Sequence, residues 1–324
     1  MSRPRALAAP ASLKGVLAAR EAAAALAAGL AEAGVECEQC PVADGGEGTA
    51  DALSSVLGGV WHETTVADPL GRPVAARWLE LPDGTAVVEA AAAVGLGLVA
   101  PEERDPLRAS SRGLGELILA AEGATGARRL LVCLGGSATV DGGRGLREVV
   151  SSLPPETRVA CDVASPLLDA ARLFAQQKGA DDAAVVELER RLAADEVLAP
   201  YAQLPGAGAA GGLGGALASL GAELVPGAAL VLDTLGFDRR LDGVALVVTG
   251  EGTVDRTTRE GKAPSEVARR AAARGVACVV FGGVVVEPLP DVETLALSGD
   301  PASVRDDLRE LGARLGARLV DTAR

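Results

Sequence analysis

The fold class is decided by residues 6–42, which read ALAAPASLKGVLAAREAAAALAAGLAEAGVECEQCPV. Ala6–Ala9 is a short apolar run typical of a buried strand, Leu17–Ala33 is long enough for an Ala-rich helix, and Val35–Val42 is a second strand pattern. A further helix is predicted over Thr49–Leu57. Strands that alternate with helices form parallel sheets, so the sequence predicts an α/β protein.

The pattern changes after residue 62. Apolar runs at Thr64–Ala67, Val74–Leu81 and Ala86–Ala90, with an Asp-Gly pair between the last two, predict a β-meander that begins a second domain. Further elements are predicted at Gly113–Glu122 (helix), Arg129–Leu134 and Arg158–Cys161 (strands), and about Asp182–Ala199 and Ala209–Leu220 (helices).

Strand–helix alternation returns near the C-terminus. The predicted elements are the strands Val244–Thr249, Val276–Phe281 and Thr294–Leu297, a helix over Lys262–Arg274, and a last amphipathic helix from Ser303. We therefore expect residues 1–62 and 236–324 to form one discontinuous Rossmann-like domain with a parallel sheet, and residues 63–235 to form an inserted α/β domain.

The composition limits the possible partners. Hydrophobic residues make up 48% and aromatic residues 2%, so the core must consist of Ala, Leu and Val packed through close helix contacts. The formal net charge is 31 − 44 = −13, which argues against a nucleic-acid or anionic-membrane surface. No apolar run reaches the ~18–20 residues of a membrane span. Five cysteines, an odd number, fit a reduced compartment, so we expect a cytoplasmic protein whose oligomeric state is left open.

Three lysines stand out because the other basic residues are all arginine. Lys14, Lys178 and Lys262 each adjoin a glycine, where the backbone can approach closely. A compact ammonium beside Gly-rich backbone is one way in which proteins hold a transferable phosphate. Chance adjacency is the alternative, so the pattern indicates phosphate chemistry without establishing it.

Four segments that combine glycine with an acid follow predicted strands. They are residues 41–49, 134–143, 161–167 and 249–255. Ligands of open α/β sheets bind at the carboxyl ends of strands, where backbone N–H groups can hold anions. The carboxylates of such loops can hold Mg²⁺ or accept a hydroxyl proton. A single loop of this kind is more often an ordinary turn, but four of them favour a site.

Residues 206–211 contain a formal Gly-x-Gly-x-x-Gly. A dinucleotide fingerprint needs a strand directly before it, and Ala199–Gln203 does not have a strand pattern. We therefore reject NAD binding at this motif and keep a helix N-terminus suited to an anion. A dinucleotide-linked oxidoreductase remains the lesser alternative, which a lack of thermal stabilisation by NAD(P) would remove. Arg112 begins a predicted helix and either clamps a carboxylate or is a solvated helix-end arginine.

Taken in order, the motifs resemble the bacterial glycerate kinase family, typified by glycerate 2-kinase. The matching stretches include residues 41–49, 68–74, 110–118, 135–139, 141–143, 161–163, 177–180, 206–214, 221–227, 249–252 with Asp255, and 261–264. The resemblance implies a two-domain α/β kinase with its active site in the cleft between the domains. It also implies that the protein uses Mg-ATP to phosphorylate D-glycerate, with 2-phosphoglycerate as the expected product.

Chemistry within these motifs suggests individual roles. Phosphoryl transfer depends on positioning and charge neutralisation, so we expect Lys14 and Lys262 to contact ATP phosphates or the transferring group. Asp44 is the first choice for the base and Asp162 the second. Backbone and hydroxyl groups expected at the phosphates are those of Gly135, Gly136, Ser137, Gly208, Gly211 and Gly212. Glu251 and Asp255 are candidates for Mg²⁺, and Arg112 or Lys178 for the substrate carboxylate.

The chain also departs from the family pattern. Ala11 stands where an acid is usual, Val140 where Asn is usual, and Ala164-Ser165 where Thr-Asn is usual. If those polar groups hold glycerate or Mg²⁺, the protein acts on another hydroxy acid or does not catalyse. The alternative to a glycerate kinase is therefore a non-catalytic or altered-substrate relative that binds a nucleotide or a small hydroxy acid.

Overall fold

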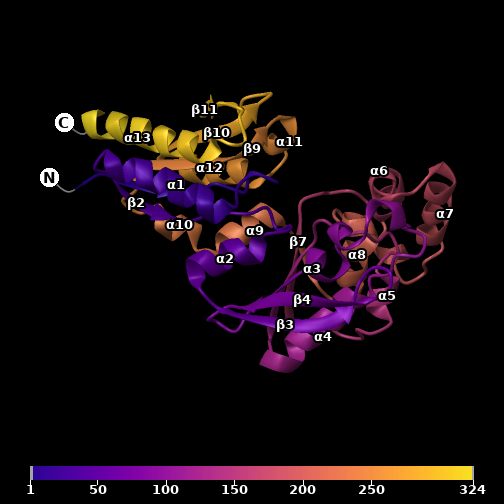
Figure 1. Cartoon of the computed structure of the whole chain (residues 1–324). Coiled ribbons are helices and arrows are strands. Elements are labelled where there is room, and N and C mark those ends of the chain that lie inside the picture. The colour runs from indigo at the N-terminus through magenta and orange to yellow at the C-terminus, as the bar shows by residue number, and fades with distance from the viewer. Residues whose placement is uncertain (1–2, 323–324) are drawn as a thin grey trace. The chain divides into compact units, whose positions relative to one another are not determined.

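The computed structural model describes residues 3–322, which divide into two compact units (Figure 1). Unit 1 comprises the residues up to Asp44, Asp51–Leu57 and the residues from Ala228 onward. Unit 2 comprises Gly45–Ala50 and Gly58–Gly227. Each unit contains its own sheet, and the predicted α/β class is confirmed.

Unit 1 is built on a five-stranded sheet in the order β11-β10-β9-β1-β2. Every neighbouring pair is parallel, as the alternation of strands and helices predicted. The strands are β1 (Arg5–Ala8), β2 (Glu36–Gln39), β9 (Leu246–Val254), β10 (Ala277–Val285) and β11 (Glu293–Ala296).

Helices cover both faces of a doubly wound parallel sheet of this kind. The helices of unit 1, two of which begin with residues of unit 2, are α1 (Ala19–Glu32), α2 (Thr49–Leu57), α9 (Gly227–Thr234), α10 (Phe237–Arg240), α11 (Arg256–Arg259), α12 (Ala263–Ala273) and α13 (Val304–Thr322). α1 and α13 pack side by side (Figure 1).

Glycine brings these two helices into backbone contact. A Cβ on Gly29 of α1 would lie 1.9 Å from Arg309 O, and a Cβ on Gly312 of α13 would lie 2.4 Å from Leu26 O. Only glycine permits such an approach. Close packing of helices thus makes up for the small number of aromatic side chains in the core, as the composition predicted.

The connections of unit 1 create a switch point between β1 and β9. The chain passes from β1 through α1 to β2 on one side, and from β9 through α12 to β10 on the other. In open α/β sheets, ligands bind outside the carboxyl ends of the strands at such a point. The segments that follow β1 and β9 are therefore the first place to look for a site in unit 1.

Unit 2 contains a six-stranded sheet in the order β3-β4-β5-β6-β7-β8. β3, β4 and β5 are antiparallel neighbours, which confirms the predicted meander, and β5 to β8 are parallel. The strands are β3 (Val60–Ala67), β4 (Pro73–Glu80), β5 (Ala86–Glu89), β6 (Arg129–Cys133), β7 (Glu156–Cys161) and β8 (Glu223–Pro226).

The α-helices of unit 2 are α3 (Ala90–Val94), α4 (Arg112–Thr125), α5 (Arg144–Arg147), α6 (Ala170–Phe174), α7 (Asp182–Ala193) and α8 (Ala209–Ser219). α4 turns Leu114, Leu117 and Ile118 toward the sheet, at the three- and four-residue spacing of one helix face, and all three are fully buried. No helix among residues 3–322 is both long and apolar enough to cross a membrane.

Three predicted elements need correction. The strand predicted to end at Thr249 continues to Val254, because β10 pairs with it as far as Val285, so 249–254 is not a loop. The helix predicted over 182–199 ends at Ala193, and the Asp195 carboxylate accepts the N–H groups of the turn that follows. The helix predicted from Ala209 is interrupted, because Ala210, Gly211 and Gly212 have positive φ.

Candidate active site

Lys14 lies in a tight turn directly after β1. Leu13 N donates to Leu17 O, and Leu17 N donates to Leu13 O, both at 2.9 Å. Gly15 has a φ of +76°, which glycine adopts without strain. The Lys14 side chain is exposed, so its ammonium is available at the carboxyl edge of the sheet.

The end of β9 supplies Glu251, whose carboxylate faces Lys262. Lys262 Nζ lies 3.6 Å from Glu251 Oε2, and Thr258 Oγ1 donates to Glu251 Oε1 at 2.6 Å. Only 13% of the Glu251 side chain is exposed. Burial raises the pKa of its carboxyl; the Thr258 hydrogen bond and the Lys262 charge oppose that rise, and the Asp44 charge adds to it.

Asp44 follows β2 and is half-buried. Its charge acts on the Glu251 carboxyl and contributes to the raised pKa of that group. The backbone of Lys14 is also near, since a Cβ on Gly252 would lie 3.6 Å from Lys14 N. The structure thus brings Lys14, Asp44, Glu251 and Lys262 to one edge of the unit 1 sheet, and we call these four residues the lysine–carboxylate cluster.

Asp255, the second residue expected at a metal, caps α11. Its Oδ1 accepts Thr257 N at 2.7 Å, Thr257 Oγ1 at 2.6 Å and Thr258 N at 3.3 Å. These bonds, chiefly the one from the Thr257 hydroxyl, lower the pKa of its carboxyl. Much of the hydrogen-bonding capacity of Asp255 is therefore used within the turn that presents Thr258 to Glu251.

Of the two acids expected at a metal, Glu251 fits a divalent cation better than Asp255. Among residues 3–322, no three His, Cys, Asp or Glu side chains are grouped so that they could hold a metal ion alone. Mg²⁺ usually takes one or two protein carboxylates and completes its shell with water and substrate phosphates. Glu251 can supply one such carboxylate.

In unit 2, residues 45–50 lie across the carboxyl ends of the parallel strands. Glu89, at the end of β5, accepts Gly48 N at 3.3 Å and Ala50 N at 2.7 Å. A Cβ on Gly45 would lie 2.5 Å from Ala160 Cβ, so only glycine fits there. The sequence interpretation missed Glu89, although an acid at the end of a predicted strand was a usable signal.

Gly135, Gly136 and Ser137 follow β6 and meet that segment. A Cβ on Gly135 would lie 2.7 Å from Gly46 Cα, so the two backbones touch. The N–H groups of Gly135 and Gly136 have no hydrogen-bond acceptor among the described residues. Asp162, after β7, is exposed and reaches the same place, with its Oδ2 4.0 Å from a Cβ built on Gly46.

Lys178 is buried beneath this loop, with only 4% of the residue exposed. Its ammonium donates to Ser137 Oγ at 3.0 Å and to Thr139 O at 2.8 Å. Burial lowers the pKa of Lys178 to about 7, and the Asp141 charge acts in the opposite direction. Lys178 therefore fixes the shape of the loop that carries Ser137.

Gly208, Gly211 and Gly212 are also packing positions. A Cβ would lie 2.3 Å from Pro166 O at Gly208, 2.1 Å from Thr139 O at Gly211 and 2.8 Å from Gly142 Cα at Gly212. Gly208 N donates to Ser165 O, and Gly212 N to Gly208 O. Close backbone packing thus explains these glycines without a ligand.

Arg112 begins α4 and is 49% exposed at its side chain. Its Nε donates to Glu116 Oε1 at 2.8 Å, and its Nη1 lies 4.0 Å from Glu148 Oε2. Neighbouring Ser111 is tied instead to Asp141, whose Oδ2 accepts Ser111 N at 2.9 Å and Ser111 Oγ at 2.8 Å. The structure places no other candidate site residue in contact with Arg112 within the described chain.

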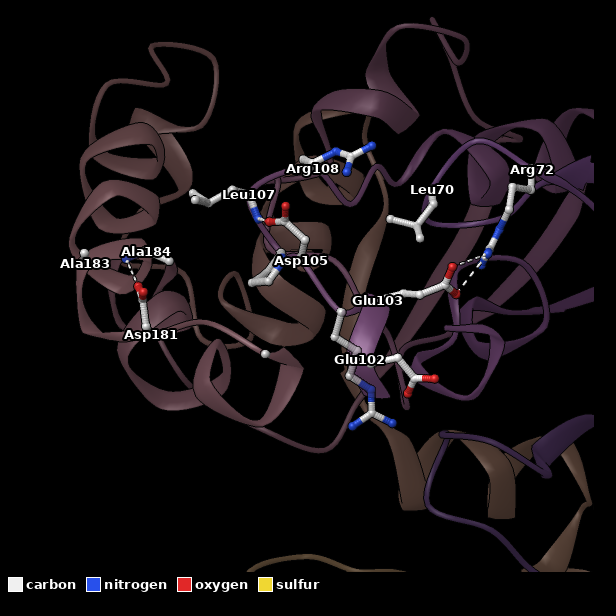
Figure 2. Close-up of a pocket in the computed structure, with 13 residues that line it drawn as sticks. Leu70, Arg72, Glu102, Glu103, Asp105, Leu107, Arg108, Asp181, Ala183 and Ala184 are labelled. Atoms are coloured by element: carbon white, nitrogen blue, oxygen red, sulfur yellow. Dashed lines mark hydrogen bonds and ion pairs between the residues drawn. The ribbon is translucent and has the colours of Figure 1, made fainter. Parts of the chain in front are cut away.

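A cavity of about 890 Å³ lies in unit 2 and is lined by none of the candidate residues (Figure 2). Arg72 Nη1 donates to both Glu103 oxygens at 3.2 and 3.0 Å. Asp181 accepts Ala184 N at 2.8 Å. Figure 2 shows these two interactions on the cavity wall. Volume alone therefore does not make this cavity the active site.

Comparison with known proteins adds an independent line of evidence. Residues 6–152 and 148–299 match the model of the glycerate kinase family. The chain is similar to a glycerate 2-kinase of Escherichia coli K12, with 40% identity over 305 residues that cover 80% of each chain. It is also similar to a glycerate kinase of Bacillus subtilis 168, with 38% identity over 322 residues, 86% of this chain and 84% of the relative.

A solved structure has the same fold. The crystal structure of a protein described as glycerate kinase 2 from Salmonella typhimurium LT2 superposes with a TM-score of 0.86 and 30% identity. The match covers 99% of this chain and 100% of the other. The similarity therefore extends over both units.

Proposed function

Because this chain belongs to the glycerate kinase family, we propose that it transfers the γ-phosphoryl group of ATP to D-glycerate, with Mg²⁺, and forms 2-phosphoglycerate. The observation that carries the proposal is the lysine–carboxylate cluster at the carboxyl ends of β1, β2 and β9. Phosphoryl transfer needs cations at the phosphates, an acceptor for the hydroxyl proton and a divalent ion, and the cluster contains side chains of each kind. The name of the relative from Escherichia coli supports the 2-hydroxyl as acceptor.

The two lysines of the cluster bind the phosphates of ATP. Lys14 is exposed on its turn, and Lys262 is partly exposed beside Glu251. Each ammonium is a compact charge on a flexible stem, so it can follow the phosphoryl group as charge moves onto the leaving oxygens. Glu251 keeps Lys262 at the edge of the sheet.

The acids of the cluster divide the remaining work. Asp44 accepts the proton of the glycerate 2-hydroxyl, and Asp162 remains the second choice for this base. Glu251 holds Mg²⁺, which when bound neutralises charge on the phosphates. Asp255 acts through Thr258 to orient Glu251, because its own carboxylate accepts bonds from the α11 turn.

In unit 2, the groups proposed to bind ligand are backbone N–H groups and an arginine. Gly135 and Gly136 have N–H groups with no acceptor among the described residues, so they can bind an anionic oxygen of a ligand. Arg112 binds the glycerate carboxylate. Its ion pair with Glu116 is exposed and therefore weak, so the guanidinium can leave Glu116 for the substrate carboxylate. Lys178 positions Ser137 and the loop.

The test is an ATP-to-ADP assay with D-glycerate and Mg²⁺, with the product identified by ³¹P NMR. We expect turnover to 2-phosphoglycerate. A phosphate on the 3-hydroxyl would overturn the proposed product, and no turnover of D-glycerate would overturn the proposed function.

The alternative of a non-catalytic or altered-substrate relative is tested alongside with Ala11→Asp. Ala11 is buried, and its N–H donates to Gly250 O at 2.8 Å next to Glu251, so an acid there would change the charge of the cluster. Val140, in contrast, packs in an apolar cluster with Leu167 and Leu188. If only the Ala11→Asp variant phosphorylates D-glycerate, the wild-type protein is a kinase that has lost its activity. If neither protein phosphorylates D-glycerate, the altered-substrate or binding role is favoured.

A further inference from the structure

A second hollow in unit 1 has no role in the mechanism above. It is a groove of about 590 Å³ between one side of α12 and the segment that joins β10 to β11. Six of the residues that line it carry the argument: Gly261, Ser265, Ala268, Ala272, Leu289 and Asp291.

One end of the groove adjoins, along the chain, Lys262 of the lysine–carboxylate cluster. Ser265, Ala268 and Ala272 follow one another at three- and four-residue spacing, so they form one face of α12 and the groove runs along the helix. Gly261 marks the end nearest the helix N-terminus and directly precedes Lys262. A ligand in the groove can therefore extend its anionic end to the Lys262 ammonium.

The walls of the groove suit a flat, partly apolar group. Leu289 is buried with Val254 and Val280, and Ala268 packs against the same cluster. The volume is within the ~300–1,000 Å³ of small-molecule sites, which are mostly apolar with a few polar groups. Small alanine side chains on the helix side leave the space open.

Asp291 supplies a polar group at the wall of the groove. It is exposed and has no hydrogen-bond or ion-pair partner among residues 3–322. Its φ is +59°, in the left-handed region that Asp and Asn tolerate better than most residues. A carboxylate near a nucleotide site accepts hydrogen bonds from ribose hydroxyls.

We propose that this groove binds the nucleoside part of the phosphate donor, with the base between Ala272 and Leu289 and the ribose hydroxyls at Asp291. The inference rests on the proposed function and adds where the donor lies. Phosphates then extend past Gly261 to Lys262.

The first experiment fills the groove and measures binding of unmodified ATP without glycerate by isothermal titration calorimetry. Ala272→Phe places a ring in the groove, and Ala273→Phe is the matched control, because Ala273 is exposed on the same helix and does not line the groove. We expect at least fivefold weaker binding for Ala272→Phe and wild-type binding for Ala273→Phe, with equal melting temperatures. Equal affinities for the two variants would overturn the proposal.

The second experiment removes only the carboxylate. Asp291→Asn keeps a residue that tolerates positive φ, so the loop is preserved. We expect the wild-type protein to prefer ATP over 2′-deoxy-ATP at least threefold in KM, and the variant to lose that preference. An unchanged ratio would remove Asp291 from the ribose site.

These readouts separate the groove from the reaction. Weakened nucleotide binding in Ala272→Phe, in a protein that does not phosphorylate glycerate, would support the groove and overturn the proposed function. If the Ala272→Phe variant phosphorylates glycerate and binds ATP with wild-type affinity, the proposed function is supported and the nucleoside groove is overturned.

Discussion

Lys262 and Lys178 are both lysines beside a glycine, but the two units use them differently. The Lys262 side chain is 32% exposed and faces Glu251 across 3.6 Å. Lys178 is 4% exposed, and its ammonium donates hydrogen bonds to Ser137 Oγ and Thr139 O. A lysine beside a glycine is therefore either an exposed cation that can bind a ligand or a buried cation that stabilises a loop. The burial of its side chain distinguishes the two.

The same contrast applies to the acids and glycines around them. In unit 1, Asp44 and Glu251 are neighbouring carboxylates whose repulsion contributes to the raised pKa of Glu251. In unit 2, Glu89 and Asp141 accept backbone N–H groups, and Gly211 touches a carbonyl. Charges at the unit 1 edge are thus available to a ligand, whereas many of those in unit 2 shape loops.

The largest expected effect tests the unit 1 side of this comparison. Asp44→Asn removes the proposed base, and loss of general-base catalysis typically lowers kcat by about 10²–10⁴-fold. The free energy of unfolding should stay unchanged, because the carboxylate is half-buried beside another acid. Steady-state kinetics and urea unfolding measure both. Asp51→Asn, an exposed acid of α2, is the control and should keep wild-type kcat.

A substitution at Gly211 tests whether the unit 2 glycines are packing positions. Gly211 has a φ of +75°, and a Cβ would lie 2.1 Å from Thr139 O, so Gly211→Ala combines backbone strain with a clash. Gly221 has a φ of +95° with nothing within 4 Å, so Gly221→Ala meets strain alone. We expect a loss of about 1–2 kcal/mol in unfolding free energy for Gly221→Ala and clearly more for Gly211→Ala. Equal losses in urea unfolding would contradict the packing role.

Lys178 should make the free energy of unfolding depend on pH. Its folded pKa of about 7 lies below the usual 10.5, so between these values the unfolded chain binds a proton that the folded chain has released. Stability should therefore rise with pH above 7, by at most about 1.4 kcal/mol per pH unit, and the full penalty is present below pH 7. Lys178→Met should lose this contribution.

The measurement is the difference in unfolding free energy between wild type and Lys178→Met at pH 7, 8 and 9. Both proteins contain the buried cysteines, whose thiol pKa values are raised by burial, so that common titration cancels. A difference that does not change with pH would show that Lys178 is not a buried, desolvated ammonium.

Local patterns predicted the elements well and the contacts poorly. The predicted start of α12 agrees with the structure because Pro264 in the first turn is a local signal. The Gly-Glu-Gly of β9 was expected to be a loop, but Gly250 and Glu251 pair with Phe281 and Gly282 of β10, partners that no local pattern reveals. The positions of Glu251, Lys262 and Asp44 relative to one another depend on such nonlocal pairing.

The smallest expected effect concerns Arg112, the exposed cation of unit 2. An exposed pair such as Arg112–Glu116 typically contributes ~0–1 kcal/mol, so Arg112→Gln should leave the unfolding free energy nearly unchanged. If Arg112 binds the glycerate carboxylate, as proposed, KM for D-glycerate should rise about tenfold, or about 1.4 kcal/mol, while KM for ATP stays constant. Arg190→Gln, in an exposed pair with Glu187, is the matched control and should change neither. An unchanged KM for D-glycerate in Arg112→Gln would mean that Arg112, like Lys178, serves the structure of unit 2 rather than the substrate.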